Sequence, residues 1–265
     1  MNFQRAFHLP FDLVLLPTVL VPLHGSAQNA PSAPIRNIVL VHGAWADGSS
    51  WSKVVPLLEA KGFHVVCVQN PLTSFAEDVA ATNRMIDAQD GPVLLVGHSY
   101  GGAVITEAGN NPKVAGLVYV AAFASDHGEL SASMGEPYRP ITGVGEPLAD
   151  GLPVLSGKGV LDDFAQDHTS KERMTLLATQ RPTKWAALAS AISAASWNNK
   201  PTWFVIASND RTIAPQQEQD SARKMNAKTL TLQTSHVPML SRPREVADFI
   251  SEAANGKSDP GVQGN

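Results

Sequence analysis

The sequence has one cysteine and few charged residues for its length. Cys67 is the single cysteine among 265 residues, so an intrachain disulfide is excluded. Charged residues make up 17% of the chain, the formal net charge is −4, and the lysines and arginines are scattered. This pattern argues against binding to nucleic acid or to an anionic membrane. No C-x-x-C or H-E-x-x-H spacing is present, so we expect no metal site and no cofactor.

Long apolar runs are also missing. Residues 1–27 begin with a basic residue, Arg5, and contain an apolar stretch over 13–21 that is too short to span a bilayer. Small residues up to Ala27 resemble a cleavage site, so we expect an export signal that is removed near this residue. Residues 28–34 are expected to form a polar linker, and 256–265 a flexible tail. The expected location is the periplasm or the medium, with no stable membrane anchor.

What the chain does have is an alternation of strand and helix signals. Its hydrophobic content of 43% is enough for one sizeable core. Six apolar runs are predicted as strands, near 37–42, 64–69, 92–97, 115–123, 202–208 and 228–234. Helices are predicted between and after them, over 51–61, 75–89, 215–226 and 243–255. The alternation predicts an α/β fold with a mainly parallel central sheet flanked by helices, and places Cys67 in the core.

The third predicted strand runs directly into Gly97-His98-Ser99-Tyr100-Gly101. A small, helix-competent segment follows, so the serine falls on a sharp strand-to-helix turn. Such a turn exposes the hydroxyl at the edge of the sheet, and the N-terminus of the following helix favours negative charge nearby. We therefore predict Ser99 as a catalytic nucleophile.

A nucleophilic serine also needs two donors for the oxyanion that forms on the substrate. One is the backbone amide that follows it, that of Tyr100. The other is expected in the loop after the first strand, where Ala44 is the best-placed residue. His42 in the same loop is interpreted as a packing residue rather than as a base.

An acid and a base follow the last two predicted strands. Asp210 comes after 202–208 and His236 after 228–234, so both should lie at the same sheet edge as Ser99. The order nucleophile, acid, base is that of a Ser-Asp-His triad. Asp126, after 115–123, is the rival for the acid.

The segment from about 125 to 198 interrupts the alternation and is expected to form a small cap over Ser99. Two helical runs are predicted in it, near 170–180 and 183–196. Apolar side chains of the cap and of the loop after the first strand are the expected pocket walls, namely Trp45, Met134, Tyr138, Leu155, Phe164, Trp185 and Trp197.

Together these motifs resemble the α/β-hydrolase superfamily over about residues 35–255. Within it, Val41–Ala44, Ala121–Phe123 and Ser235–Pro243 are similar to the branch that holds plant methyl esterases, hydroxynitrile lyases and small bacterial esterases. The resemblance implies a serine hydrolase that cleaves small to medium carboxylic esters through an acyl-enzyme on Ser99.

The resemblance departs from the lyases at one position. Lyases of this branch carry a lysine directly after the catalytic histidine to hold the cyanide leaving group, and this sequence has Val237 there. Lyase chemistry is therefore disfavoured, as is dehalogenation, which needs an aspartate in place of Ser99. An acyltransferase or perhydrolase, a ligand-sensing relative and an amidase or peptidase remain open, as do the natural substrate and the oligomeric state.

Overall fold

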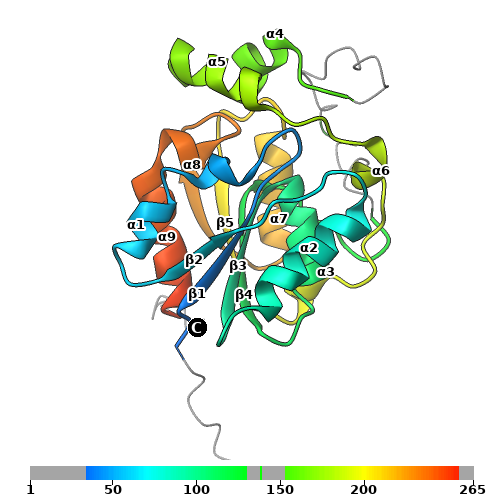
Figure 1. Ribbon diagram of the computed structural model, residues 1–265, viewed down its shortest axis with the longest axis vertical. Helices are drawn as coiled ribbons and strands as arrows, with labels where there is room; N and C mark the ends of the chain where they lie inside the picture. Colours follow the sequence, from blue (N-terminus) through cyan, green and yellow to red (C-terminus); the bar gives the residue numbers. More distant parts are fainter. Residues whose placement is uncertain (1–33, 130–137, 139–152, 257–265) are drawn as a thin grey trace, which may run out of the picture. The chain divides into compact units, whose positions relative to one another are not determined.

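One parallel sheet organises the chain in the computed structural model, which describes residues 34–129, 138 and 153–256 (Figure 1). The strands lie in the order β2-β1-β3-β4-β5-β6. Their bounds are β1 Asn37–Val41, β2 His64–Cys67, β3 Val93–Ser99, β4 Val114–Ala122, β5 Thr202–Ala207 and β6 Lys228–Leu232. Each neighbouring pair is parallel. The six strands predicted from the apolar runs are therefore present.

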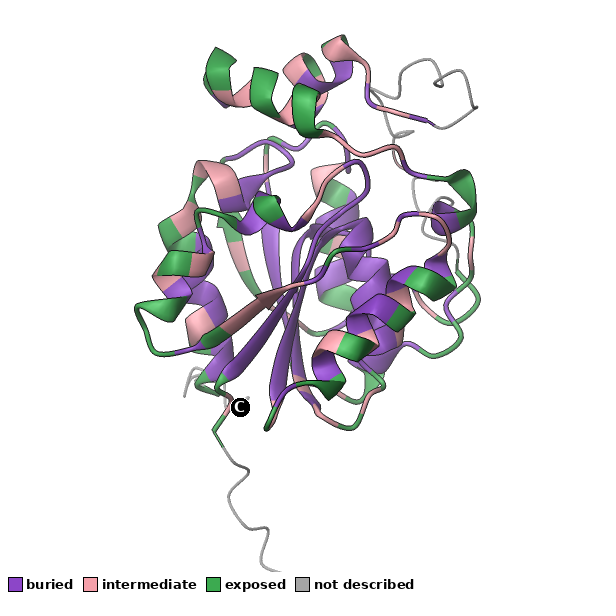
Figure 2. Cartoon of the chain, in the orientation of Figure 1, coloured by how far each residue is buried: buried purple, intermediate pink, exposed green. Residues whose placement is uncertain are grey.

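The burial of each strand follows its place in the sheet (Figure 2). All residues of the central strands β1, β3 and β5 are buried, which is why these strands read as continuous apolar runs. The edge strands β2 and β6 are only partly covered. Cys67 lies on β2 and is half-buried against the core, so the prediction that it is a buried core residue is met only in part. Its burial still raises the pKa of the thiol to about 11.

Helices cover both faces of the sheet (Figure 1). The longer ones begin where the sequence places a cap or a proline: the Ser74 hydroxyl accepts a hydrogen bond from the amide of Glu77 at the start of α2, and prolines open α7 and α9. The bounds are α2 Phe75–Asp87, α3 Tyr100–Ala108, α7 Pro215–Lys224, α8 Pro238–Ser241 and α9 Pro243–Ala254.

The helix predicted over 51–61 is shorter than expected. A 3₁₀ turn, η1, occupies Gly48–Trp51, and only Val55–Glu59 forms the α-helix α1. Asp47 explains the early turn, because its side chain accepts a hydrogen bond from the amide of Ser49 and caps η1.

The cap segment contains α4 (Gly157–Gly159), the π-helical turn η3 (Val160–Phe164), α5 (Ser170–Thr179), α6 (Trp185–Leu188) and the 3₁₀ turn η4 (Ser196–Asn198). The helix near 170–180 is present as α5, opened by a capping box of Thr169 and Glu172. The helix predicted over 183–196 is reduced to the four residues of α6. The backbone of this segment forms hydrogen bonds with other segments instead. The amide of Lys184 donates to the carbonyl of Leu72, and the amide and carbonyl of Ile192 bond to the backbone of the turn at 128–129.

The order of the strands determines where a site can form. From β1 the chain passes to β2 on one side, and from β3 it passes to β4 on the other. The carboxyl ends of β1 and β3 therefore lie at a topological switch point, which is where open α/β sheets bind ligands. Ser99 ends β3 at this point, and the loop of Gly43 to Trp45 follows β1.

Some expectations fall on residues that the structure does not describe. The predicted export signal over 1–27, residues 28–33 of the linker and the tail over 257–265 lie outside the described residues, as does the pocket candidate Met134. The described residues all belong to one unit, Ala33–Asn265. Within the described part of the chain, no helix has the length and apolar character needed to cross a bilayer.

Candidate active site

Ser99 occupies a strained turn between β3 and α3. Its φ of 51° and ψ of −124° lie outside the regions that ordinary residues prefer. The turn is tight enough that a Cβ on Gly97 would lie 2.5 Å from the carbonyl oxygen of Gly101. A Cβ on Gly43 would lie 2.8 Å from the Cβ of Ser99, so only glycine lets the loop after β1 approach the serine this closely.

Ser99, His236 and Asp210 form one chain of hydrogen bonds. The distance from His236 Nδ1 to Asp210 Oδ2 is 2.6 Å, and that from His236 Nε2 to Ser99 Oγ is 2.8 Å. The carboxylate accepts a hydrogen bond from Nδ1–H, which leaves the Nε2 lone pair free to accept the serine proton. The side chains of His236 and Asp210 are fully buried, so water does not compete for these bonds.

Asp126, the rival acid, does not take part in this chain. It lies in the turn after β4, where its carboxylate accepts a hydrogen bond from the amide of His127. Its own amide donates to Glu129. The structure thus brings Asp210, and not Asp126, to His236.

The two predicted oxyanion donors are the backbone amides of Ala44 and Tyr100. Neither amide has a hydrogen-bond acceptor among the residues that the structure describes. Tyr100 is fixed by its side chain, whose hydroxyl donates to Asp78 Oδ2 at 2.7 Å. An oxyanion that forms on the substrate of Ser99 needs two such backbone amides as hydrogen-bond donors.

His42 is placed as a packing residue. Its Nδ1 donates to the carbonyl of Gly43 at 2.8 Å, and its Nε2 accepts from the amide of Asn70 at 3.0 Å. Burial is the main cause that lowers the pKa of His42 to about 4, so the imidazole is neutral. Both ring nitrogens are committed to the loop, which leaves none for catalysis.

The cap packs directly on the His236 ring. The Phe164 ring, from η3, lies 5.0 Å from that of His236, and the His98 ring lies 4.8 Å away on another side. His98 donates to the carbonyl of His236 at 2.8 Å, so it also holds the backbone of the base. These contacts exclude water from the imidazole.

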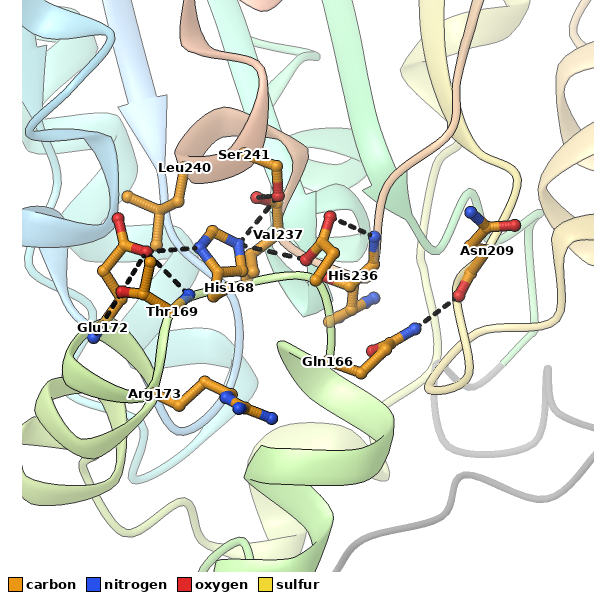
Figure 3. A network of polar contacts seen from close by, with 12 residues as sticks. Gln166, His168, Thr169, Glu172, Arg173, Asn209, His236, Val237, Leu240 and Ser241 are labelled. Atoms are coloured by element: carbon orange, nitrogen blue, oxygen red, sulfur yellow. Dashed lines mark hydrogen bonds and ion pairs between the residues drawn. The ribbon is translucent and has the colours of Figure 1, made fainter.

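Three consecutive cap residues hold the loops that carry the acid and the base (Figure 3). Gln166 donates to the carbonyl of Asn209 at 2.7 Å, directly before Asp210. Asp167 accepts from the amide of Ser235, directly before His236, at 3.0 Å. His168 bonds to the hydroxyl of Ser241 at 2.8 Å.

These three contacts could not be predicted from local sequence patterns, because each joins residues that are 43 to 73 positions apart. The same is true of Thr183, whose hydroxyl accepts from the amide of Trp45 at 2.9 Å. Trp45 has a positive φ of 58°, so this bond from the cap fixes the strained end of the oxyanion loop. The cap therefore positions both sides of the site.

A cavity of about 510 Å³ lies between the cap and the loop after β1. Its apolar lining residues include Trp45, Leu155, Val160, Phe164, Leu176, Val237 and Leu240. Its charged lining residues are Asp47, Lys53, Lys171 and Glu172, and of these Lys53 and Glu172 are paired with each other at 2.6 Å. Ser99 and His236 do not line this cavity; it borders the triad through His98 and Phe164.

Of the predicted pocket walls, Trp45, Leu155 and Phe164 line this cavity, and Tyr138, Trp185 and Trp197 do not. Trp185 is 51% exposed on α6. Trp197 is buried, and its indole N–H donates to the carbonyl of Ser125 at 3.0 Å. Tyr138 donates to Asp220 on α7. Each has a packing or surface role.

The profile of the Alpha/beta hydrolase family matches residues 38–249. The chain belongs to this family. The pyrethroid hydrolase of Sphingobium wenxiniae is 26% identical over 263 residues, which cover 85% of this chain and 90% of that protein. A crystal structure of a pyrethroid hydrolase superposes with a TM-score of 0.73 at 21% identity, covering 85% of this chain and 99% of that one. The crystal structure of a methylesterase from Arabidopsis superposes with a TM-score of 0.69 at 17% identity, covering 84% of this chain and 100% of that one.

These comparisons confirm three predictions from the sequence. The fold class is that of an α/β-hydrolase. The predicted resemblance to plant methyl esterases is matched at the level of the fold by the plant enzyme among the similar structures. The chain is a hydrolase enzyme of this family.

Proposed function

We propose that this hydrolase is a serine esterase that cleaves uncharged carboxylic esters through an acyl-enzyme on Ser99. The observation that carries the proposal is the buried chain of hydrogen bonds from Ser99 through His236 to Asp210. Relatives named as a pyrethroid hydrolase and as a carbendazim hydrolyzing esterase support ester hydrolysis.

The first half of the reaction follows from the placement of these groups. Ser99 Oγ attacks the ester carbonyl carbon while His236 Nε2 takes the serine proton. The carbonyl electrons move onto oxygen, and the amides of Ala44 and Tyr100 donate to this oxyanion. As the oxyanion collapses, the bond to the alcohol oxygen breaks and His236 gives its proton to that oxygen.

The second half repeats these steps with water. His236 removes a proton from a water molecule, which attacks the acyl carbon and forms a second oxyanion at the same amides. Collapse releases the acid and returns the proton to Ser99 Oγ. Asp210 accepts a hydrogen bond from His236 Nδ1–H throughout, and it stabilises the imidazolium that forms in each half of the reaction.

The cavity beside the triad supports the choice of uncharged substrates. Most of its lining is apolar, and the charges of Lys53 and Glu172 are paired with each other. An apolar acyl or alcohol group is stabilised there by leaving water, whereas a charged group would lose hydration against a lining that is mostly apolar.

A substrate panel tests the function. We expect turnover of p-nitrophenyl esters, slower or no cleavage of the matching p-nitroanilides, and no cyanide release from mandelonitrile, because Val237 offers no charge to the leaving group. Added alcohols should not divert the acyl group from water. Ester turnover that is absent, or cyanide release as fast as ester cleavage, would contradict the proposal. Preferred transfer to the alcohol would identify an acyltransferase instead.

The cavity gives a second prediction, about chain length. Leu176 on α5 lines the cavity, so Leu176→Trp should fill part of it. We expect kcat/KM for the longest acyl chains to fall by roughly fourfold for each methylene that is no longer buried, with p-nitrophenyl acetate unaffected. Met174→Trp is the matched control, because Met174 is 56% exposed on the same helix and does not line the cavity. An equal loss on all esters would show that the cavity does not hold the chain.

A further inference from the structure

A second carboxyl group is buried behind the triad, and the reaction described above does not use it. Glu218 lies in the first turn of α7 and is fully buried, on the side of the helix that packs against β5. An unpaired carboxylate is rarely buried, since burying an ion without a partner costs far more free energy than burying a neutral polar group. Its surroundings therefore have to explain how it is accommodated.

The Glu218 carboxyl has one donor and one acceptor as neighbours. Its Oε2 accepts a hydrogen bond from the amide of Ala207, the last residue of β5, at 2.9 Å. Its Oε1 is buried and has no donor within the described part of the chain. The same carboxyl is within hydrogen-bonding reach of the carboxyl of Asp210. Two carboxylates offer only lone pairs to each other, so this contact needs a proton between them.

The partners of the two groups decide which of them carries the proton. Asp210 accepts from the amides of Thr212 and Ile213 at 2.7 and 3.0 Å, and from His236 Nδ1 at 2.6 Å. These three donors favour its charged form, whereas Glu218 has a single donor. Burial, and after it the charge of Asp210, raises the pKa of Glu218 well above its ordinary value. The proton therefore belongs to Glu218.

We propose that Glu218 is a neutral carboxylic acid at neutral pH and donates a hydrogen bond to Asp210, as a positioning residue for the triad. The proposal rests on the proposed function in that it assigns a role to Glu218 in that same site. The bond gives the Asp210 carboxylate a fourth donor, in addition to the two backbone amides and His236. It also leaves the buried pair with one negative charge, which is what a single imidazolium can balance.

The isosteric variant tests the protonation state. In Glu218→Gln the amide oxygen can accept from Ala207 and the amide N–H can donate to Asp210, as the neutral acid does. We expect kcat, KM and the acid limb of the kcat/KM–pH profile to stay as in the wild type. In Glu218→Met the donor is lost, and we expect kcat to fall roughly 10- to 100-fold with KM little changed.

An ionised Glu218 would give the opposite pattern. Glu218→Gln would then remove a negative charge next to the triad, so the acid limb of the profile would move to lower pH. That shift would overturn the proposal, as would a Glu218→Met enzyme with wild-type kcat. Exposed Glu252 on α9 provides the matched control, because Glu252→Gln removes a charge that solvent screens and should leave the profile unchanged.

A measurement without turnover separates this proposal from the function. With ¹³C-labelled glutamate side chains, one carboxyl signal should have the chemical shift of the protonated acid through the neutral range and disappear in Glu218→Gln. The same signal is expected in Ser99→Ala, which has no nucleophile. Failure of the ester panel with this signal present would reject only the esterase. Absence of the signal in a folded, active enzyme would reject only the role of Glu218.

Discussion

Replacing Ser99 by alanine should abolish ester hydrolysis while leaving the fold intact. The serine oxygen forms the bond to the acyl group, and no other hydroxyl is bonded to His236 among the described residues. Loss of the nucleophile in a comparable triad lowers kcat by about 10⁶-fold, and the remainder comes from the oxyanion site and binding. The substitution removes only the serine hydroxyl and no apolar packing contact of the core, so the midpoint of thermal unfolding should change little.

Covalent labelling makes this result specific. A phosphonate or sulfonyl fluoride probe should add one adduct per chain, found on Ser99 by peptide mass spectrometry, and none in Ser99→Ala. Ser49→Ala and Ser50→Ala are the controls, because both serines follow the oxyanion loop at η1 without a contact to His236. Labelling of Ser49 or Ser50 with loss of activity would show that the nucleophile is misassigned.

The position of Ser99 could be predicted because its determinants are local. A buried strand, two glycines and a helix-competent segment lie within a few residues of it, and together they allow only a tight strand-to-helix turn. Asp210 and His236 could be predicted for a topological reason. The carboxyl ends of parallel strands meet at one edge, so the residues after β5 and β6 had to approach the serine.

The cap could not be predicted in the same way. The run over 183–196 has helical composition, yet Thr183 and Lys184 bond to Pro153 and Leu72. A backbone group can make its hydrogen bonds inside a helix or with another segment, and sequence composition does not show which partner is near. The helix is consequently reduced to α6, and Trp185 becomes exposed.

Glu218 is a case in which the sequence held a signal of a different kind. It shares a helical face with Ala222 and with Met225, the residue that caps α7, which follow it by four and seven residues and are both buried. A glutamate on the apolar face of an amphipathic helix conflicts with its surroundings and marks a buried polar contact. The pattern gives no indication of the partner, because Asp210 reaches Glu218 only through the turn that follows β5.

Replacing Asp210 by asparagine should cost roughly 10⁴-fold in kcat, the loss seen when the triad acid of a serine protease is changed in this way. The fold should survive, because an asparagine oxygen can still accept from the amides of Thr212 and Ile213. In this orientation of the asparagine side chain, its amide N–H points toward His236 Nδ1. The histidine can then accept there only by carrying its proton on Nε2, and in that tautomer it cannot take the proton of Ser99.

Asp126→Asn is the matched control for this prediction. Asp126 is bonded within its own turn to the amide of His127, and asparagine can make the same bond. We expect kcat to stay within about threefold of the wild type, since surface substitutions that keep their contacts change free energies by only about 0.5 kcal/mol. Both variants should be compared for kcat, thermal unfolding and probe labelling of Ser99, which should slow in Asp210→Asn alone. A larger loss in Asp126→Asn than in Asp210→Asn would place the acid after β4 and contradict the hydrogen-bond chain on which the proposed mechanism depends.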